Sequence, residues 1–220
     1  MILGLDSSTS ASAACVLRAD GAAFEAAPEP HALSAAPAHA RELLPAIAGV
    51  MEEAQVSFDA LEAIAVGVGP GTFTGLRIGI ATARALAAGN ELPLRPVSSL
   101  AALAAGIESE LALPLIDAKR GELFAALYEG GELLWGPIVG APEEIMRRLE
   151  AAGRRPRAAG DGSVRFREVL EAAGIRVDPD ESRSHVVRAL HVCRLAQRLP
   201  DAPPESVLPD YLRAPDAKPK

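Results

Sequence analysis

Two aspartates end short apolar runs and are each followed by a polar turn. Asp6 follows Ile2–Leu5 and precedes a hydroxyl-rich stretch that includes Ser8 and Thr9. Asp117 ends a second apolar run in the same way. A carboxylate at a strand end beside a polar turn can handle a metal ion or a phosphate. The alternative is that Asp6 only caps its turn by accepting hydrogen bonds from backbone N–H groups.

A glycine-rich segment, residues 67–87, predicts a strand, a tight turn and a helix in succession. Such a turn can bind phosphate through free backbone N–H groups and the helix dipole. However, no Lys-Ser or Lys-Thr pair follows the glycines, and Leu94 and Arg95 stand where a dinucleotide site needs an acidic residue. We therefore favour a structural turn that aims the helix, with Thr74 as its N-cap.

His39 opens the first predicted helix, residues 39–54, in which Leu43, Ile47 and Val50 recur at helical spacing. Pro45 removes one backbone hydrogen bond, so we expect a bend or a later helix start. A metal site on this helix would need a second histidine four residues after His39. Leu43 stands there instead, which favours a capping or solvent-facing role for His39 and predicts no metal.

Composition narrows the possible functions. Hydrophobic residues make up 49% of the 220-residue chain and aromatic residues only 4%, so the core must consist of small aliphatic side chains. A net charge of −7 argues against a free-standing nucleic-acid binder. Cys15 and Cys193 lie far apart in sequence and are expected to be reduced, buried thiols. Neither a leader nor a membrane-spanning segment is recognisable, so we expect a cytoplasmic protein.

The order of predicted elements indicates an α/β fold. Three antiparallel strands open the chain and are followed by alternating helices and strands up to about residue 105. A second unit begins near Leu113 and resembles the first, which suggests an internal duplication. We predict one subdomain over residues 1–106 and a smaller one over residues 107–220. Later helices are expected at 142–152, 164–172 and 184–199, and residues 201–220 as an extended tail anchored by Val207, Leu208, Tyr211 and Leu212.

The two Asp-ended strands, together with Gly160-Asp161-Gly162, resemble the phosphate and adenosine motifs of the actin, Hsp70 and sugar-kinase (ASKHA) fold. With the glycine-rich segment added, essentially the whole chain resembles the TsaB (YeaZ) family. The most specific stretches are Asp6-Ser7-Ser8-Thr9, residues 69–79, Val97-Ser98-Ser99-Leu100, residues 117–122 and Tyr211-Leu212-Arg213. The resemblance implies two tandem, related α/β subdomains with mixed sheets.

The resemblance also implies a function. TsaB works in the formation of N6-threonylcarbamoyladenosine at position 37 of tRNAs that read ANN codons. The related catalytic subunit, TsaD, carries a metal-binding histidine pair on its first helix, of which only His39 is present here. We therefore expect a non-catalytic accessory subunit that needs no cofactor. Its nucleotide motifs would be relics, with Asp6, Ser8, Thr9, Asp117 and Gly160 as the vestigial candidates.

The implied partners are a TsaD-type catalytic subunit, a TsaE-type ATPase, a second copy of the chain when it is alone, and tRNA through the complex. On the second helix, Gly75, Gly79 and Ala83 recur every four residues and place small side chains on one face. We expect that face to receive a partner helix. The predicted interface consists of Leu43, Ile47, Val50, Gly75, Leu76, Gly79, Ala83 and Leu86.

Two other functions stay open. A nucleotide-binding ATPase or kinase of the same fold would use Asp6, Asp117 and Gly160. A metalloprotease of the glycoprotease type would need a metal at His39, and no second ligand or nucleophile is recognisable beside it.

Overall fold

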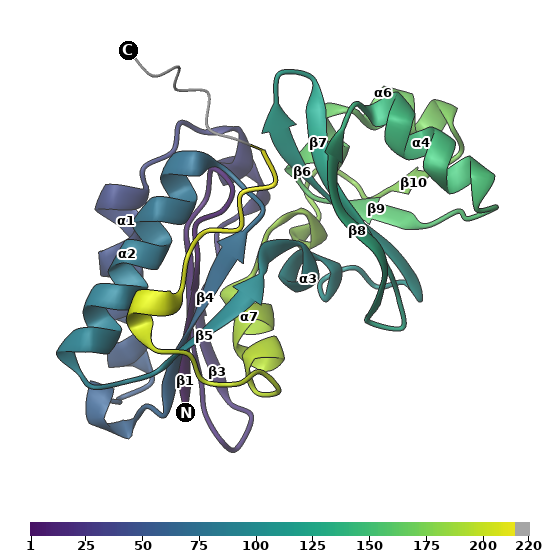
Figure 1. The fold of residues 1–220 in the computed structure, drawn as a ribbon. Helices are drawn as coiled ribbons and strands as arrows, with labels where there is room; N and C mark the ends of the chain where they lie inside the picture. Colours follow the sequence, from purple (N-terminus) through teal and green to yellow (C-terminus); the bar gives the residue numbers. More distant parts are fainter. Residues whose placement is uncertain (214–220) are drawn as a thin grey trace, which may run out of the picture.

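Two five-stranded sheets with the same strand order form the framework of the computed structural model, which describes residues 1–213 (Figure 1). The first sheet has the order β3-β2-β1-β4-β5. Its strands are β1 (Ile2–Asp6), β2 (Ala13–Leu17), β3 (Ala23–Ala26), β4 (Ala63–Gly69) and β5 (Leu94–Ser98). The strands β1, β2 and β3 are antiparallel, and β4 and β5 run parallel to β1.

The second sheet repeats this plan. In the order β8-β7-β6-β9-β10 it contains β6 (Leu111–Lys119), β7 (Glu122–Glu129), β8 (Glu132–Gly140), β9 (Arg157–Ala159) and β10 (Arg176–Val177). Again the first three strands are antiparallel and the last two parallel to the first of them. The predicted ASKHA-type fold with an internal duplication is therefore confirmed.

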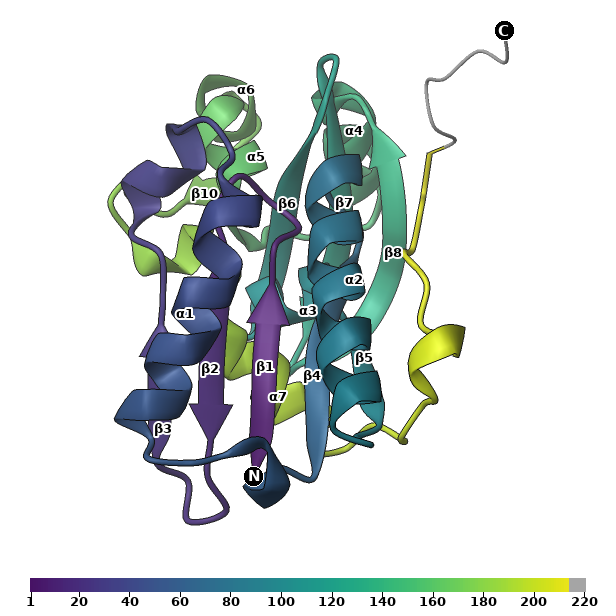
Figure 2. The same cartoon turned by 90° about the vertical axis from the view of Figure 1, so that its left-hand side faces the viewer.

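Helices cover both faces of the first sheet. The helices α1 (His39–Glu53) and α2 (Phe73–Gly89) lie side by side on its outer face (Figure 2), whereas α3 (Ser99–Ala104) and α7 (Ala189–Ala196) lie between the two sheets (Figure 1). The second sheet is covered by α4 (Pro142–Ala151), α5 (Asp161–Arg165) and α6 (Arg167–Ala172). Four short 3-10 helices complete the fold of residues 1–213: η1 (Pro30–Ser34), η2 (Phe58–Ala60), η3 (Arg183–His185) and η4 (Pro204–Ser206).

Successive side chains of β1 point to opposite faces of the first sheet and so belong to two separate parts of the core. Leu3 and Leu5 point to α1 and α2, while Ile2 faces the layer between the sheets. Along β6, Ile116 faces that same middle layer and Leu115 faces α4. Since successive side chains of a strand point to opposite faces, strands covered on both sides read as continuous apolar runs.

Several predicted boundaries are wrong. The helix α1 begins at His39 as predicted and continues through Pro45, so the alternative of a later start is wrong, and the N-cap position of α2 is Thr72 instead of Thr74. Residues 164–172 belong to two short helices, α5 and α6, and the helix expected from residue 184 is only α7. Local pattern places such boundaries to within a few residues at best.

We call each sheet, together with the helices that cover it, a lobe. The chain returns to the first lobe after the second sheet is complete. The helix α7 packs on β1 and β2, and residues 202–212 run along β5 and α2 (Figure 1). Residues 189–212 therefore lie against the first lobe, although we expected them in a second subdomain that runs to residue 220. Residues 214–220 of the predicted tail lie outside the described part of the chain.

The predicted interface needs a correction. Leu43, Ile47 and Val50 are between 1% and 3% exposed because they pack on the first sheet. Leu76 and Ala83 are buried as well, and Leu86 is half-buried against the same core. The glycine face of α2 also has an intramolecular use, because a Cβ at Gly75 would lie 2.0 Å from the Ser7 carbonyl oxygen and one at Gly79 2.4 Å from the Ser7 Oγ.

Among residues 1–213, no helix combines the length and the apolar character that crossing a membrane requires.

Candidate functional site: the cleft between the lobes

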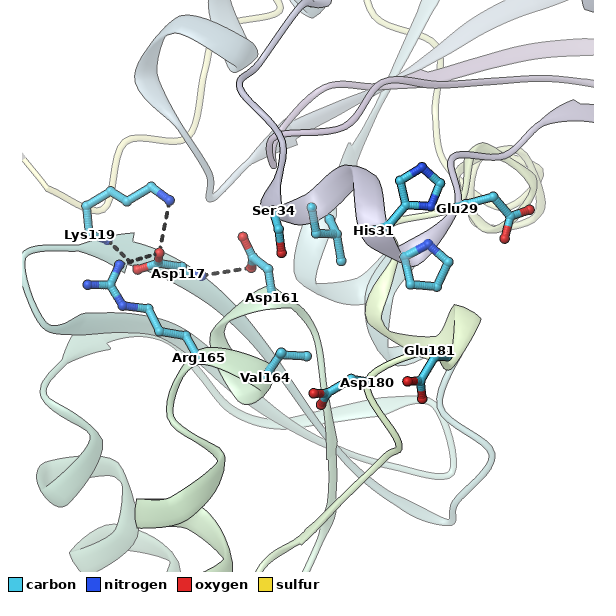
Figure 3. A pocket seen from close by; sticks show the side chains of 12 residues that line it. Glu29, His31, Ser34, Asp117, Lys119, Asp161, Val164, Arg165, Asp180 and Glu181 are labelled. Atoms are coloured by element: carbon cyan, nitrogen blue, oxygen red, sulfur yellow. Dashed lines mark hydrogen bonds and ion pairs between the residues drawn. The ribbon is translucent and has the colours of Figure 1, made fainter.

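Two adjoining pockets open between the lobes and share Asp117 and Lys119. The first, of about 580 Å³, is bounded by η1 on one side and by α5 and the loop after β10 on the other (Figure 3). Its wall consists of Glu29, Pro30, His31, Leu33, Ser34, Asp117, Lys119, Asp161, Val164, Arg165, Asp180 and Glu181. The second, of about 530 Å³, lies between the N-terminal turn of α2, the β6–β7 turn and residues 210–213.

Asp117 is held by two cationic side chains. One carboxylate oxygen accepts hydrogen bonds from the Lys119 ammonium at 2.9 Å and the Arg165 guanidinium at 2.7 Å, and the other accepts from the Lys119 backbone N–H (Figure 3). Burial alone would raise the pKa of Asp117, but the hydrogen bonds from Lys119 and Arg165 outweigh it and hold that pKa below its ordinary value. Asp117 is therefore a charged, fully engaged carboxylate.

Asp161 stands beside this pair at the start of α5. It accepts a hydrogen bond from the Asp117 backbone N–H at 2.9 Å. Burial raises the pKa of Asp161, and the neighbouring Asp117 charge acts in the same direction. Gly160, which precedes it, is buried, and a Cβ there would lie 2.0 Å from the Leu115 carbonyl oxygen. Gly160 thus allows a close approach of two backbone segments and does not line the cleft.

Asp6, Ser8 and Thr9 are buried and line neither pocket. One Asp6 oxygen accepts from the Ser8 N–H at 2.8 Å and from the Ser8 hydroxyl at 2.7 Å, and the other accepts from the Ser99 hydroxyl at 2.9 Å. Burial raises the pKa of Asp6 although these hydrogen bonds act against it. Turn capping by Asp6 is thus what the structure shows.

His39 is buried, contrary to the expected capping or solvent-facing role. Its Nδ1 pairs with the Ser12 Oγ at 2.8 Å, and burial lowers its pKa. Its Nε2 has no hydrogen-bond partner among the described residues. Leu43, one turn along α1, belongs to the core, so this helix offers no second ligand beside His39.

These residues do not fit a nucleotide. The first pocket presents five carboxylate side chains and two cationic ones, and both cations are bound to Asp117. Glu29 and Asp180 are likewise paired, with Arg183 and Arg167, so no Lys or Arg side chain that lines this pocket is left to bind a polyphosphate. Within residues 1–213, no group of three His, Cys, Asp or Glu side chains is arranged to hold a metal ion.

Several cleft residues were missed by sequence reasoning. Lys119 lies within the family stretch 117–122 but was given no role, Arg165 lies in no motif, and the η1 residues lie in a proline-marked connection that pattern rules leave unassigned. Only Asp161 had a signal, since it directly follows the predicted Gly160.

The outer surface of α1 and α2 is a second notable feature. We define the outer helix face as the surface formed by a set of exposed residues on these two helices. They are Leu44, Pro45, Ala48 and Gly49 of α1 and Ala81, Ala85 and Ala88 of α2. Leu44 is 54% exposed, and the other members are small or lack a flexible side chain. The two helices lie side by side on the outer face of the first sheet (Figure 2), and each of these residues is exposed.

The duplicated sheets and the cleft between them define a two-lobed α/β protein of the ASKHA fold. The family model described as tRNA N6-adenosine threonylcarbamoyltransferase (TsaD) matches residues 31–171. A Bacillus subtilis protein named tRNA threonylcarbamoyladenosine biosynthesis protein TsaB is 28% identical over 189 residues, which cover 83% of this chain and 82% of that protein. A Mycobacterium leprae protein is 31% identical over the whole chain, which spans 56% of the relative's length.

A solved structure described as YeaZ from Pseudomonas aeruginosa is 30% identical to the chain, with a TM-score of 0.78. The match covers 96% of this chain and 99% of that one. The chain belongs to the TsaB (YeaZ) family.

Proposed function

We propose that this protein is a non-catalytic, cytoplasmic subunit that supports the formation of N6-threonylcarbamoyladenosine at position 37 of tRNAs reading ANN codons. It pairs with a TsaD-type catalytic subunit, works with a TsaE-type ATPase and forms a homodimer when alone. It meets tRNA through the complex. Support comes from its relatives in the TsaB family, one of which carries that pathway in its name.

The observation that carries the partner role is the outer helix face. Small residues let a second pair of helices approach closely, and burial of Leu44 would remove an exposed apolar side chain from water. The predicted pairing through the first two helices thus stays a proposal, but its contact residues change. Leu43, Ile47, Val50, Gly75, Leu76, Gly79 and Ala83 support the helices from inside, and the outer helix face makes the contact.

Size-exclusion chromatography of the chain mixed with a TsaD-type subunit tests this assignment. The wild-type chain should co-elute with that subunit. The variant Ala85→Arg should bind about tenfold more weakly or worse, because it would bury an unpaired charge in the contact. A reconstituted modification assay, read by mass spectrometry of tRNA nucleosides, should lose product in the same variant.

The matched control is Ala151→Arg, which changes an alanine that is also exposed, on α4 of the second lobe. It should bind like wild type. Absence of a complex with the wild-type chain, or equal binding by both arginine variants, would contradict the proposal. Titration calorimetry with Mg-ATP tests the ATPase alternative, for which the acidic cleft predicts no heat of binding.

A further inference from the structure

The last described segment of the chain, residues 202–213, runs along the first lobe and ends on the second. We call it the strap. Ala202 and Leu94 exchange two backbone hydrogen bonds, at 2.8 and 2.9 Å, which attach the strap to the edge strand β5. Val207 is buried in the core under α2, and the Asp210 N–H donates to the Val68 carbonyl at 2.8 Å. The strap therefore belongs firmly to the first lobe up to residue 210.

An aromatic contact fixes the next residue to α2. The Tyr211 ring stacks on the Phe73 ring with 5.4 Å between centroids. The Arg77 guanidinium lies 4.0 Å from the Phe73 centroid and donates through Nε to the Tyr211 hydroxyl at 3.0 Å. Three side chains from two distant parts of the sequence thus hold the strap at the first turn of α2.

Two residues later, the strap is bound to the second lobe. The Arg213 guanidinium forms an ion pair with Glu122 and donates to the Ala118 carbonyl at 2.9 Å, both at the β6–β7 turn. Leu212 packs on the core between the sheets. Two extended residues reach only about 7 Å. The β6–β7 turn and the first turn of α2 therefore cannot move far apart while Tyr211 and Arg213 both stay bound.

The strap closes one side of the second cleft pocket, which Tyr211, Leu212 and Arg213 help to line. A different contact joins the lobes beside the first pocket, where Arg183 pairs with Glu29 at 2.6 Å. That pair is exposed on both sides, and exposed ion pairs hold little. The strap is the better-anchored of these two links.

We infer that the strap is a clamp, which fixes the opening of the cleft by tying the N-terminal turn of α2 to the β6–β7 turn. The clamp is a property of the chain alone. Its test therefore needs no partner and is independent of the proposed function.

Pulsed electron paramagnetic resonance measures the opening of the cleft as the distance between two spin labels. The labels are attached at Ala40→Cys on α1 and Glu168→Cys on α6. Both positions are exposed, whereas the native thiols Cys15 and Cys193 are buried. Labelled chains are diluted with unlabelled ones so that only distances within one chain contribute. Two truncations are compared: a chain that ends at Arg213 keeps the strap, and one that ends at Pro209 lacks its crossing residues.

The chain ending at Arg213 should give the same narrow distance distribution as the full chain. The chain ending at Pro209 should shift to longer distances and broaden, while its circular dichroism and cooperative thermal unfolding show that it is folded. An unchanged distribution after truncation at Pro209 would overturn the clamp. So would a shift already present in the chain ending at Arg213.

A charge exchange tests the same contact without truncation. The single changes Arg213→Glu and Glu122→Arg should each broaden the distribution, because each places like charges opposite one another. The double variant should give a narrower distribution than either single variant, although a carboxylate at position 213 cannot replace the hydrogen bond to the Ala118 carbonyl. A double variant as broad as the single variants would show that the ion pair does not hold the cleft.

Discussion

At the scale of single residues, Asp6 illustrates how an apparent catalytic group can be structural. Both of its oxygens are already bonded, to Ser8 and Ser99. Gly67 lies so close that a Cβ there would be 1.8 Å from an Asp6 oxygen. The carboxylate is therefore enclosed by its own loop, and its effect should appear in stability.

The variant Asp6→Asn should change how stability depends on pH. Burial raises the pKa of Asp6 in the folded protein above its ordinary value. The folded state thus binds this proton more tightly than the unfolded state, and the contribution of Asp6 to stability falls as pH rises through the folded pKa. Asparagine does not titrate. The free energy of unfolding of the variant, minus that of wild type, should therefore rise from about pH 3 to about pH 7.

Urea unfolding at a series of pH values measures this difference. Asp6→Ala serves as the comparison, because it leaves the Ser8 N–H and the Ser99 hydroxyl without their acceptor and should cost about 1–3 kcal/mol. A difference between the asparagine variant and wild type that falls with rising pH would refute the buried-carboxylate account.

At the scale of elements, α2 is positioned by what its glycines allow. The loop after β1 lies directly against its first turns, with the Ser7 hydroxyl donating to the Gly75 carbonyl at 2.9 Å and the Thr72 N–H donating to the Ser8 carbonyl at 2.7 Å. Only a residue without Cβ permits this approach at Gly75. The glycine-rich segment therefore lets the loop after β1 pack directly against α2.

Gly75→Ala should destabilise the protein by about 1–3 kcal/mol or more, because its Cβ would overlap backbone in a packed region. Gly89→Ala in the same helix is the control. A Cβ at Gly89 meets nothing within 4 Å, so its effect should stay within about 0.5 kcal/mol. Denaturant unfolding compares the two variants. Equal stability would show that the loop can shift without cost.

The same helix shows how far sequence reasoning reaches. Period and glycine spacing predicted α2 and the strand before it, because both signals are local. The use of the glycine face could not be predicted, because Ser7 lies 68 positions before Gly75 and no local pattern encodes that contact. Of the cleft residues, Asp117 was predicted as a site residue because a strand end marks it, and Asp161 was marked by its place after Gly160. Lys119, Arg165 and the η1 residues join the cleft through tertiary packing alone.

At the scale of the whole molecule, α7 packs residues 189–196 onto the first two strands of the chain. Cys193 on α7 and Cys15 on β2 are both fully buried, and the Cys193 Sγ lies 3.5 Å from the Cys15 carbonyl oxygen. A Cβ at Gly4 would lie 2.5 Å from the same sulfur, so α7 rests directly on β1. The expected reduced and buried thiols are found, and they mark the centre of the first lobe.

Both thiols should resist modification until the protein unfolds globally. Burial raises the pKa of Cys193 well above its ordinary value, which disfavours the reactive thiolate. Ellman's reagent should release no thionitrobenzoate when mixed with the native chain and two equivalents in denaturant. The rate of release should follow the loss of circular dichroism. An exposed cysteine from Ala36→Cys should react at once. Stoichiometric reaction of the native thiols would show that α7 opens separately.

The late return of the chain has a consequence for synthesis on the ribosome. The helix that covers the inner face of β1 and β2 lies at Ala189–Ala196, more than 170 residues after those strands. A nascent chain that has emerged only to residue 106 would hold all five strands of the first sheet, and α3 beside β4 and β5, but would lack the helix that covers the inner face of β1 and β2. The first lobe starts at the N-terminus, yet it completes its core only after the second lobe has been made.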